Sequence, residues 1–327
     1  MSSVISLLQA AICFGTVLML GALGEIITEK SGNLNLGVPG IMYLGGIASL
    51  AGVFLYENNN PDAVGIVCVI IALVCGFAGA VLGGLIYSFL TITLRANQNV
   101  TGLAITIFGS GVANFFGGEL NKMAGGVGQI SVKVTSAAFR ANIPFLANLG
   151  TVGKLLFSYG FMVYLAIIMA VLTQLFLDKT RMGLNLRAVG ENPATADAAG
   201  VNVAKYRYFA TCIGAGISGL GGIFFVMDYT KGTWSNSGDI EALGWLAVAL
   251  VIFTSWKPRN AIWGAYFFGL LYWLCTYISG LTRGTQELFN MTPYVATIIV
   301  LVIVSLRKKR ENLGPANLGL VYFREER

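Results

Sequence analysis

The chain of 327 residues consists mainly of long apolar runs separated by short polar stretches. A helix needs about 20 mainly apolar residues to cross the hydrocarbon core of a bilayer. Nine runs cross it or nearly cross it, and they lie near residues 4–27, 40–56, 63–94, 101–117, 155–177, 206–227, 240–255, 260–281 and 292–306. Charged residues make up only 11% of the sequence. The pattern predicts an all-α, polytopic integral membrane protein with about 8–10 transmembrane helices.

Three of the nine runs have irregular lengths. The run at 63–94 is too long to stand upright and is expected to tilt or project, whereas the runs at 40–56 and 240–255 are short. Short runs indicate broken or re-entrant helices, which are stable only where protein or a cavity surrounds their free backbone groups. No linker or change of composition divides the chain, so residues 1–327 are interpreted as one transmembrane domain.

The basic residues are distributed unevenly between the two predicted sides of the membrane. If the loop at 178–205 faces the cytoplasm, alternation of the spans places 15 of the 21 Lys and Arg residues there, including those of the tail at 307–327. The positive-inside rule predicts this asymmetry. The net charge of +6 is therefore explained by membrane topology, and nucleic-acid binding is a poor interpretation of it.

No motif in the sequence indicates catalysis. Histidine is absent, and the five cysteines lie in apolar runs without CxxC spacing, so neither a catalytic nor a metal site is expected. A GxxxxGK[ST] motif is also absent, so we expect no ATP or other cofactor to bind within the chain itself. Gly214, Gly216 and Gly219 form a GxGxxG pattern, but it lies inside a hydrophobic run, where helix packing explains it better than dinucleotide binding.

The polar loop at 178–204 carries a strong helix signal between two apolar runs. Asn192 is a favourable N-cap, and Pro193 suits the first helical position because its missing N–H has no partner there in any case. The residues ATADAA continue the helix, and Gly200 can adopt the positive φ that ends it. The sequence therefore predicts a short, rigid surface helix near 192–200, to which another protein is expected to dock.

A second polar stretch, EIITEKSGNLNLGVPG, covers residues 25–40. A helix that starts near residue 4 has used the core of about 30 Å by about residue 24. Glu25, Glu29 and Lys30 are therefore expected at a solvated helix end. SGNLNLGVPG fits either a tight turn between spans or a broken helix whose amides line a substrate path, and the sequence alone leaves both interpretations open.

Two blocks of sequence resemble a known family. EIITEKSGNLNLGVPGIMYLGG, at residues 25–46, is similar to the opening signature of membrane permeases in ATP-binding-cassette (ABC) importers for simple sugars and nucleosides, within the branched-chain amino acid and ribose permease family. The match of GLNLRAVGENPATADAAGVNVAKYRYF, which runs on into GAGISGLGG, is closer. Pro39 departs from the signature, because an acidic residue is common there, and this puts a charge-based role for the position in doubt.

The resemblance implies a multi-pass permease subunit without catalytic activity, in the plasma membrane of a prokaryote, that forms the pathway for a nucleoside or a simple sugar. It also implies partners: a cytoplasmic ABC ATPase that binds ATP and Mg²⁺, an extracytoplasmic substrate-binding protein, and a second permease that is usually a different but related chain. The helix near 192–200 corresponds to the coupling helix that docks on the ATPase. The implied docking residues are Arg187, Glu191, Asn192, Pro193, Asp197 and Gly200.

The predicted spans hold amides, hydroxyls and aromatic rings but very few ionisable groups, which fits a neutral, hydroxyl-rich ligand. The candidate pathway residues are Asn33, Asn35, Thr106, Phe108, Asn114 and Trp245. Each also has an ordinary structural explanation, since amides and hydroxyls form hydrogen bonds between helices and aromatic rings pack in the core.

Two alternative functions are an ion-coupled secondary transporter and a channel for a small polar solute. The first usually has ionisable residues at mid-membrane, and the second requires a filter or pore ring. Neither feature is evident in the sequence.

Overall fold

The computed structural model describes residues 2–125, 130–141, 150–235, 238–277, 283–307 and 313–323. Residues 308–312 and 324–327 of the predicted tail lie outside the described residues. Within the described ranges the secondary structure is helical apart from an isolated β-bridge between Ser131 and Thr233. The predicted all-α class is therefore confirmed.

Six helices of the described chain are long and apolar enough to cross a membrane. They are α1 (Ser2–Lys30), α2 (Val38–Asn59), α3 (Gly65–Ser88) with its π-helical continuation η1 (Phe89–Thr93), α4 (Gln98–Met123), α8 (Phe161–Lys179), and α11 (Val203–Phe224) with its continuation η2 (Phe225–Tyr229). Three shorter apolar helices follow, namely α12 (Asp239–Phe253), α13 (Pro258–Leu274) and α15 (Thr292–Arg307). Each of the nine predicted runs has most of its residues on one of these helices, but the run at 155–177 begins on α7 (Gly150–Phe157) and is interrupted before α8. The last residues of the run at 260–281 lie outside the described residues.

Two of the predicted run lengths have different outcomes. The run at 240–255 is short as predicted, because α12 has 15 residues. The run at 40–56 is not, because α2 has 22 residues. Pro39 lies in the first turn of α2, where its missing N–H costs nothing, and the polar residues after Tyr56 continue the helix to Asn59.

The remaining short elements are α5 (Lys133–Phe139), α7 (Gly150–Phe157), α9 (Arg181–Glu191), α10 (Pro193–Ala198), η3 (Cys275–Tyr277) and α14 (Arg283–Asn290).

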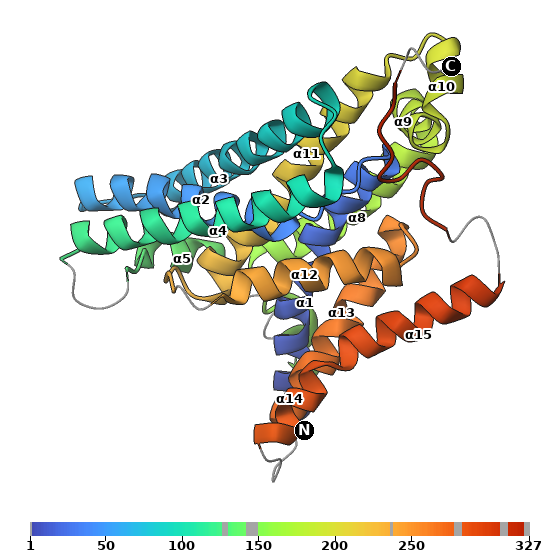
Figure 1. Ribbon diagram of the computed structural model, residues 1–327. Coiled ribbons are helices and arrows are strands. Elements are labelled where there is room, and N and C mark those ends of the chain that lie inside the picture. The colour runs from blue at the N-terminus through green and yellow to red at the C-terminus, as the bar shows by residue number, and fades with distance from the viewer. Residues whose placement is uncertain are drawn as a thin grey trace.

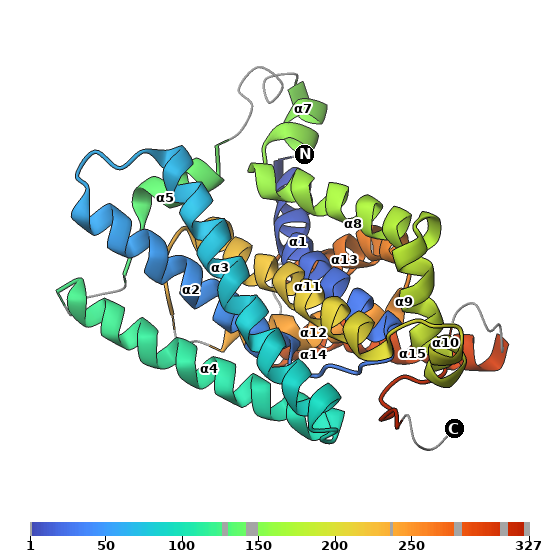
Figure 2. The same cartoon turned by 90° about the horizontal axis from the view of Figure 1, so that it is seen from above.

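Helices α1 and α11 pack together at the centre of the bundle (Figure 2). On one side α11 packs on α2 and α3, with α4 outside α2, and on the other side α1 packs on α8, α12 and α13. Glycines permit the close approach, because a Cβ on Gly24 of α1 would overlap the backbone oxygen of Gly214 on α11, and one on Gly219 would overlap Ala80 of α3. The GxGxxG pattern is therefore a helix-packing surface, as predicted.

The structure brings together the segments that alternation of the spans places on one side of the membrane. The last residues of α1, α3 and α8 and the first residues of α4, α11 and α13 lie on one face, which residues 313–323 cross beside α9 and α10 (Figure 1). We call this the basic face, because it carries Lys30, Arg95, Lys179, Arg207 and Lys257. The other end of the bundle is called the opposite face.

Candidate functional site

Helices α9 and α10 form a helical unit on the basic face (Figure 1). α9 begins where the hydroxyl of Thr180 accepts the N–H of Gly183 at 3.0 Å. α10 begins where the side-chain oxygen of Asn192 accepts the N–H of Thr195 at 3.0 Å, with Pro193 at the first helical position. The predicted N-cap is therefore confirmed. The 11-residue helix α9 was not predicted, although Thr180 is a capping residue that could have indicated it.

The end of α10 has the hydrogen bonds of a Schellman motif. Gly200 has φ of +85°, its N–H donates to Asp197 O at 2.9 Å, and the N–H of Val201 donates to Ala196 O at 3.0 Å. These bonds satisfy backbone carbonyls that the helix leaves without intrahelical donors. The predicted role of Gly200 is confirmed. The helix itself spans only Pro193–Ala198, because the predicted range of 192–200 included its capping residues.

The inner side of the unit is anchored to the membrane helices. Val189 of α9, Ala196 of α10 and Val203 of α11 are buried together in a small apolar cluster. The Asn185 amide nitrogen donates to the hydroxyl of Tyr206 at 2.9 Å. Gly190 lies directly against the backbone of Lys30, where a Cβ would overlap the carbonyl oxygen. α9 and α10 are therefore held against α1 and α11 and do not hang free as a loop.

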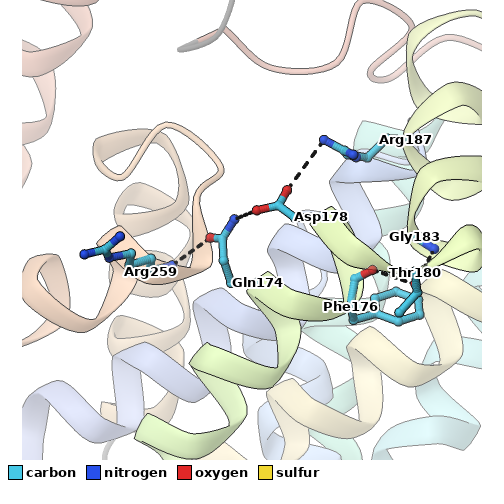
Figure 3. A network of polar contacts seen from close by, with 7 residues as sticks. All are labelled: Gln174, Phe176, Asp178, Thr180, Gly183, Arg187 and Arg259. Carbon is cyan, nitrogen blue, oxygen red and sulfur yellow. Dashed lines mark hydrogen bonds and ion pairs between the residues drawn. The ribbon is translucent and has the colours of Figure 1, made fainter.

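A chain of polar contacts links α9 to α8 and α13 (Figure 3). Arg187 pairs with Asp178 at 3.6 Å, Asp178 accepts from the Gln174 amide at 2.5 Å, and the Gln174 oxygen accepts the backbone N–H of Arg259 at 3.1 Å. An exposed ion pair contributes only about 0–1 kcal/mol to the free energy of unfolding. This row of contacts therefore orients the three helices more than it stabilises the protein. Arg187, a predicted docking contact, thus has a partner within the chain.

The other two predicted charged contacts differ in their surroundings. Asp197 is half-buried, and its carboxylate accepts the hydroxyl of Tyr322 at 3.0 Å. Glu191 is exposed. Together with Arg187, Glu191 lines a cavity of about 610 Å³ beside α9, whose wall also includes Lys30 and Lys257. Two charged residues of α9, Arg187 and Glu191, therefore border a hollow in the basic face.

Residues 313–323 form a strap across the basic face, which the sequence did not indicate. The N–H of Asn317 donates to Gly190 O at 3.0 Å, and the N–H of Gly319 donates to Gly32 O at 3.0 Å. The buried guanidinium of Arg207 donates to the side-chain oxygen of Asn317 at 2.9 Å. The strap thereby joins the α9–α10 unit, the segment between α1 and α2, and the start of α11.

The end of α1 is buried, contrary to prediction. Glu25 is 1% exposed and Glu29 is 3% exposed, so the expectation of a solvated helix end was wrong for both. A carboxylate oxygen of Glu25 accepts the N–H of Asn35 at 3.1 Å, and Glu29 accepts the indole N–H of Trp256. The prediction placed the end of the lipid core from helix length alone. Helix length contains no information about the segment after α1, which folds back over these carboxylates.

The segment at 31–37 is a buried link between α1 and α2, and three predicted pathway residues hold it in place. The Asn33 amide donates to the hydroxyl of Thr211 at 3.1 Å, and the side-chain oxygen of Asn35 accepts the N–H of Gly37 at 2.9 Å. The hydroxyl of Thr106 donates to Leu36 O at 3.0 Å. These contacts are structural, and the role of the three residues in a substrate path stays a prediction.

The remaining predicted pathway residues lie on other helices. Phe108 of α4 is 49% exposed, and Trp245 of α12 is half-buried. The side-chain oxygen of Asn114 is buried and accepts no hydrogen bond from the residues that the structure describes. Nothing in these surroundings tests whether Phe108, Asn114 or Trp245 contacts a ligand.

The described chain has six membrane-length helices, of which α1 and α11 form the central pair, and a capped helical unit on one face, which is the architecture expected of a multi-pass membrane transport subunit. Residues 7–303 match the family described as branched-chain amino acid transport system / permease component, and the chain belongs to this family. It is a permease subunit of an ABC importer and a multi-pass protein of the prokaryotic plasma membrane.

Three relatives are similar over most of their length. A permease protein of Haloferax volcanii that is named for glucose ABC transport is 32% identical, over 99% of each chain. The guanosine ABC transporter permease protein of Bacillus subtilis is 31% identical, over 90% of each chain. A nucleoside ABC transporter permease protein of Lactococcus lactis is 31% identical, over 89% of each chain.

Proposed function

We propose that this chain forms the translocation pathway for a neutral nucleoside or simple sugar, and that its α9–α10 unit docks on a separate cytoplasmic ATPase. The observation that carries the docking role is the doubly capped helix α10, which presents exposed residues while its inner side is anchored. Thr195 and Ala198 are exposed, whereas Pro193 and Ala196 are buried. A surface helix anchored in this way is suited to transmit a rigid-body movement of the ATPase to the spans.

The cavity beside α9 supports the same proposal. Glu191 and Arg187 lie on its wall together with Lys30 and Lys257, so a partner that fits there meets both signs of charge. Complementary charges at a docking surface favour the correct orientation of the partner. We expect the ATPase to cover the exposed side of α10 and to contact Glu191.

The proposed assembly contains further chains. A second permease, different from this chain but related to it, completes the pathway, and an extracytoplasmic binding protein delivers the ligand. ATP and Mg²⁺ bind to the ATPase partner, since this sequence lacks a phosphate-binding loop. ATP binding then closes the ATPase pair, and the docked helices move between outward-open and inward-open arrangements.

Reconstitution tests the transport function. The chain, the ATPase, the second permease and the binding protein are placed in proteoliposomes, and uptake of radiolabelled guanosine and glucose is measured. We expect uptake of one of them only with ATP on the ATPase side. Uptake by this chain alone, driven by an ion gradient, would overturn the proposal, as would ATP-dependent uptake of leucine only.

Site-specific cross-linking tests the docking role separately. In a background with the native cysteines replaced, Thr195→Cys introduces a thiol on the exposed side of α10. We expect this variant to cross-link to the ATPase in the assembled importer. Asp62→Cys is the control, because Asp62 is exposed at the opposite face between α2 and α3. Equal cross-linking of both variants, or none from Thr195→Cys, would contradict the docking role.

A further inference from the structure

A second cavity, of about 460 Å³, lies in the half of the bundle near the opposite face. Its wall is built from α1, η2, α12, α13, η3 and α14, so segments from both halves of the sequence converge on it. The volume is within the range of roughly 300–1,000 Å³ that is typical of small-molecule sites. None of the predicted pathway residues lines it.

One side of this cavity is a continuous wall of aromatic rings. Phe14 and Tyr272 stack with centroids 4.3 Å apart, and Phe225 and Tyr229 stack with centroids 5.4 Å apart. An edge contact of 6.3 Å between Phe14 and Tyr229 joins the two pairs, and another of 6.3 Å joins Tyr272 to Trp273. All five rings line the cavity. Such a surface can pack against a flat ring by stacking or edge contact.

The polar groups on the wall complement this aromatic surface. The cavity is also lined by Asp239 in the first turn of α12, by Thr230 and Thr276, and by Gln286 of α14. The indole nitrogen of Trp273 is buried at this wall. An aromatic wall with several polar groups is typical of a site that orients a ring-bearing polar ligand.

We propose that this cavity is a nucleoside-binding site of the permease, in which the base packs on the aromatic wall and the ribose hydroxyls bond to Asp239 and Gln286. A carboxylate accepts hydrogen bonds from ribose hydroxyls, as acidic residues do in dinucleotide sites. This inference rests on the proposed transport function and adds to it the location of the site and the choice of a nucleoside over a sugar.

The charges of the cavity favour an uncharged ligand. Asp239 supplies the carboxylate of the wall, and the lining residues that the structure describes include neither Lys nor Arg. The ammonium group of an amino acid could pair with Asp239, but its carboxylate would meet no cation among these residues and would lose solvation. A nucleoside carries no charge at neutral pH and has no such cost.

Equilibrium binding to the full-length chain in lipid nanodiscs tests the site. We expect radiolabelled guanosine to bind the wild-type chain, unlabelled inosine to compete, and neither glucose nor leucine to compete at the same concentration. Trp273→Ala should weaken binding by roughly ten- to a hundredfold, which is the range that loss of an aromatic partner of a base produces. Asp239→Asn should also weaken it.

Trp263→Ala is the matched control, because Trp263 lies on the same helix but is 75% exposed away from the cavity. A second measurement avoids dependence on the folding of the alanine variant. Gln286→Cys, made without the native cysteines, places a thiol at an exposed lining position, and guanosine should slow its reaction with a soluble thiol reagent. Unchanged guanosine affinity in both Trp273→Ala and Asp239→Asn, or no protection at position 286, would overturn the proposal, as would equal competition by glucose.

The two proposals fail in distinguishable ways. If the reconstituted wild-type importer takes up guanosine with ATP, but the Trp273 and Asp239 variants bind and transport it normally, the transport function stands and the site is wrong. If the wild-type importer takes up neither guanosine nor glucose, the transport function fails irrespective of the variants.

Discussion

The double substitution Asn192→Ala with Gly200→Ala tests whether the rigidity of α10 matters for coupling. Removing the N-cap costs about 1 kcal/mol. Gly200 has no neighbouring atom within 4 Å of an added Cβ, so Gly200→Ala introduces no clash and only the left-handed φ of +85° opposes it. That conformation costs a non-glycine residue about 1–2 kcal/mol. The caps lie at opposite ends of α10 and share no hydrogen-bond partner, so the two costs should add.

The summed cost of about 2–3 kcal/mol corresponds to an increase of about 30- to 150-fold in the equilibrium for local opening of α10. Hydrogen exchange measures this directly, and the amides of Ala199 and Val201 should exchange faster by that factor while those of central α11 stay unchanged. In the reconstituted importer we expect the variant to insert normally and its ATPase partner to hydrolyse ATP, with much less substrate taken up per ATP.

The control is Gly200→Asn, because Asn tolerates the left-handed region far better than Ala. Alone, Gly200→Asn should exchange almost as slowly as the wild-type protein, whereas Gly200→Ala should exchange faster. Fast exchange of α10 together with normally coupled uptake would refute the reasoning, since a loose helix would then transmit movement as well as a rigid one.

Three further predictions concern helix packing, the buried end of α1 and the strap. Gly222→Ala would push a methyl group into the backbone of Met42, whereas Gly118→Ala meets open space, so only Gly222→Ala should reduce the monodisperse yield in detergent. Trp256→Phe removes the indole donor from buried Glu29, which should destabilise the protein by about 1–3 kcal/mol and lower its Tm in a thermal unfolding assay. Deleting residues 313–327 removes the strap, so amides of the 31–37 link should exchange faster; unchanged exchange would show that the strap does not hold the link.

Local patterns predicted the elements and their ends correctly where neighbours in sequence are sufficient. Each of the nine apolar runs has most of its described residues in a helix, and Asn192, Pro193 and Gly200 have the capping roles that their residue types indicate. A cap is made by side-chain and backbone groups within a few residues, so the sequence contains the needed information. α9 was missed because its signal, Thr180, directly follows the polar end of an apolar run.

Burial and convergence could not be predicted in the same way. Glu25 and Glu29 were expected in solvent because helix length was considered alone, but Asn35 and Trp256, which lie far from one another in the chain, reach these two carboxylates. The strap required contacts across more than a hundred residues, such as the one between Arg207 and Asn317. The hydrophobic periodicity of a sequence contains no information about such long-range contacts.

The sequence by itself determined that this protein is a multi-pass helical membrane protein with a capped helix on its basic face, because hydrophobic runs and capping residues act locally. The tertiary structure decided which polar groups are buried, that the C-terminal strap joins α9 to the α1–α2 link, and that rings from α1, η2 and α13 form one aromatic wall. These features depend on how glycine-lined helices pack, and packing places side chains together that the sequence separates by hundreds of residues.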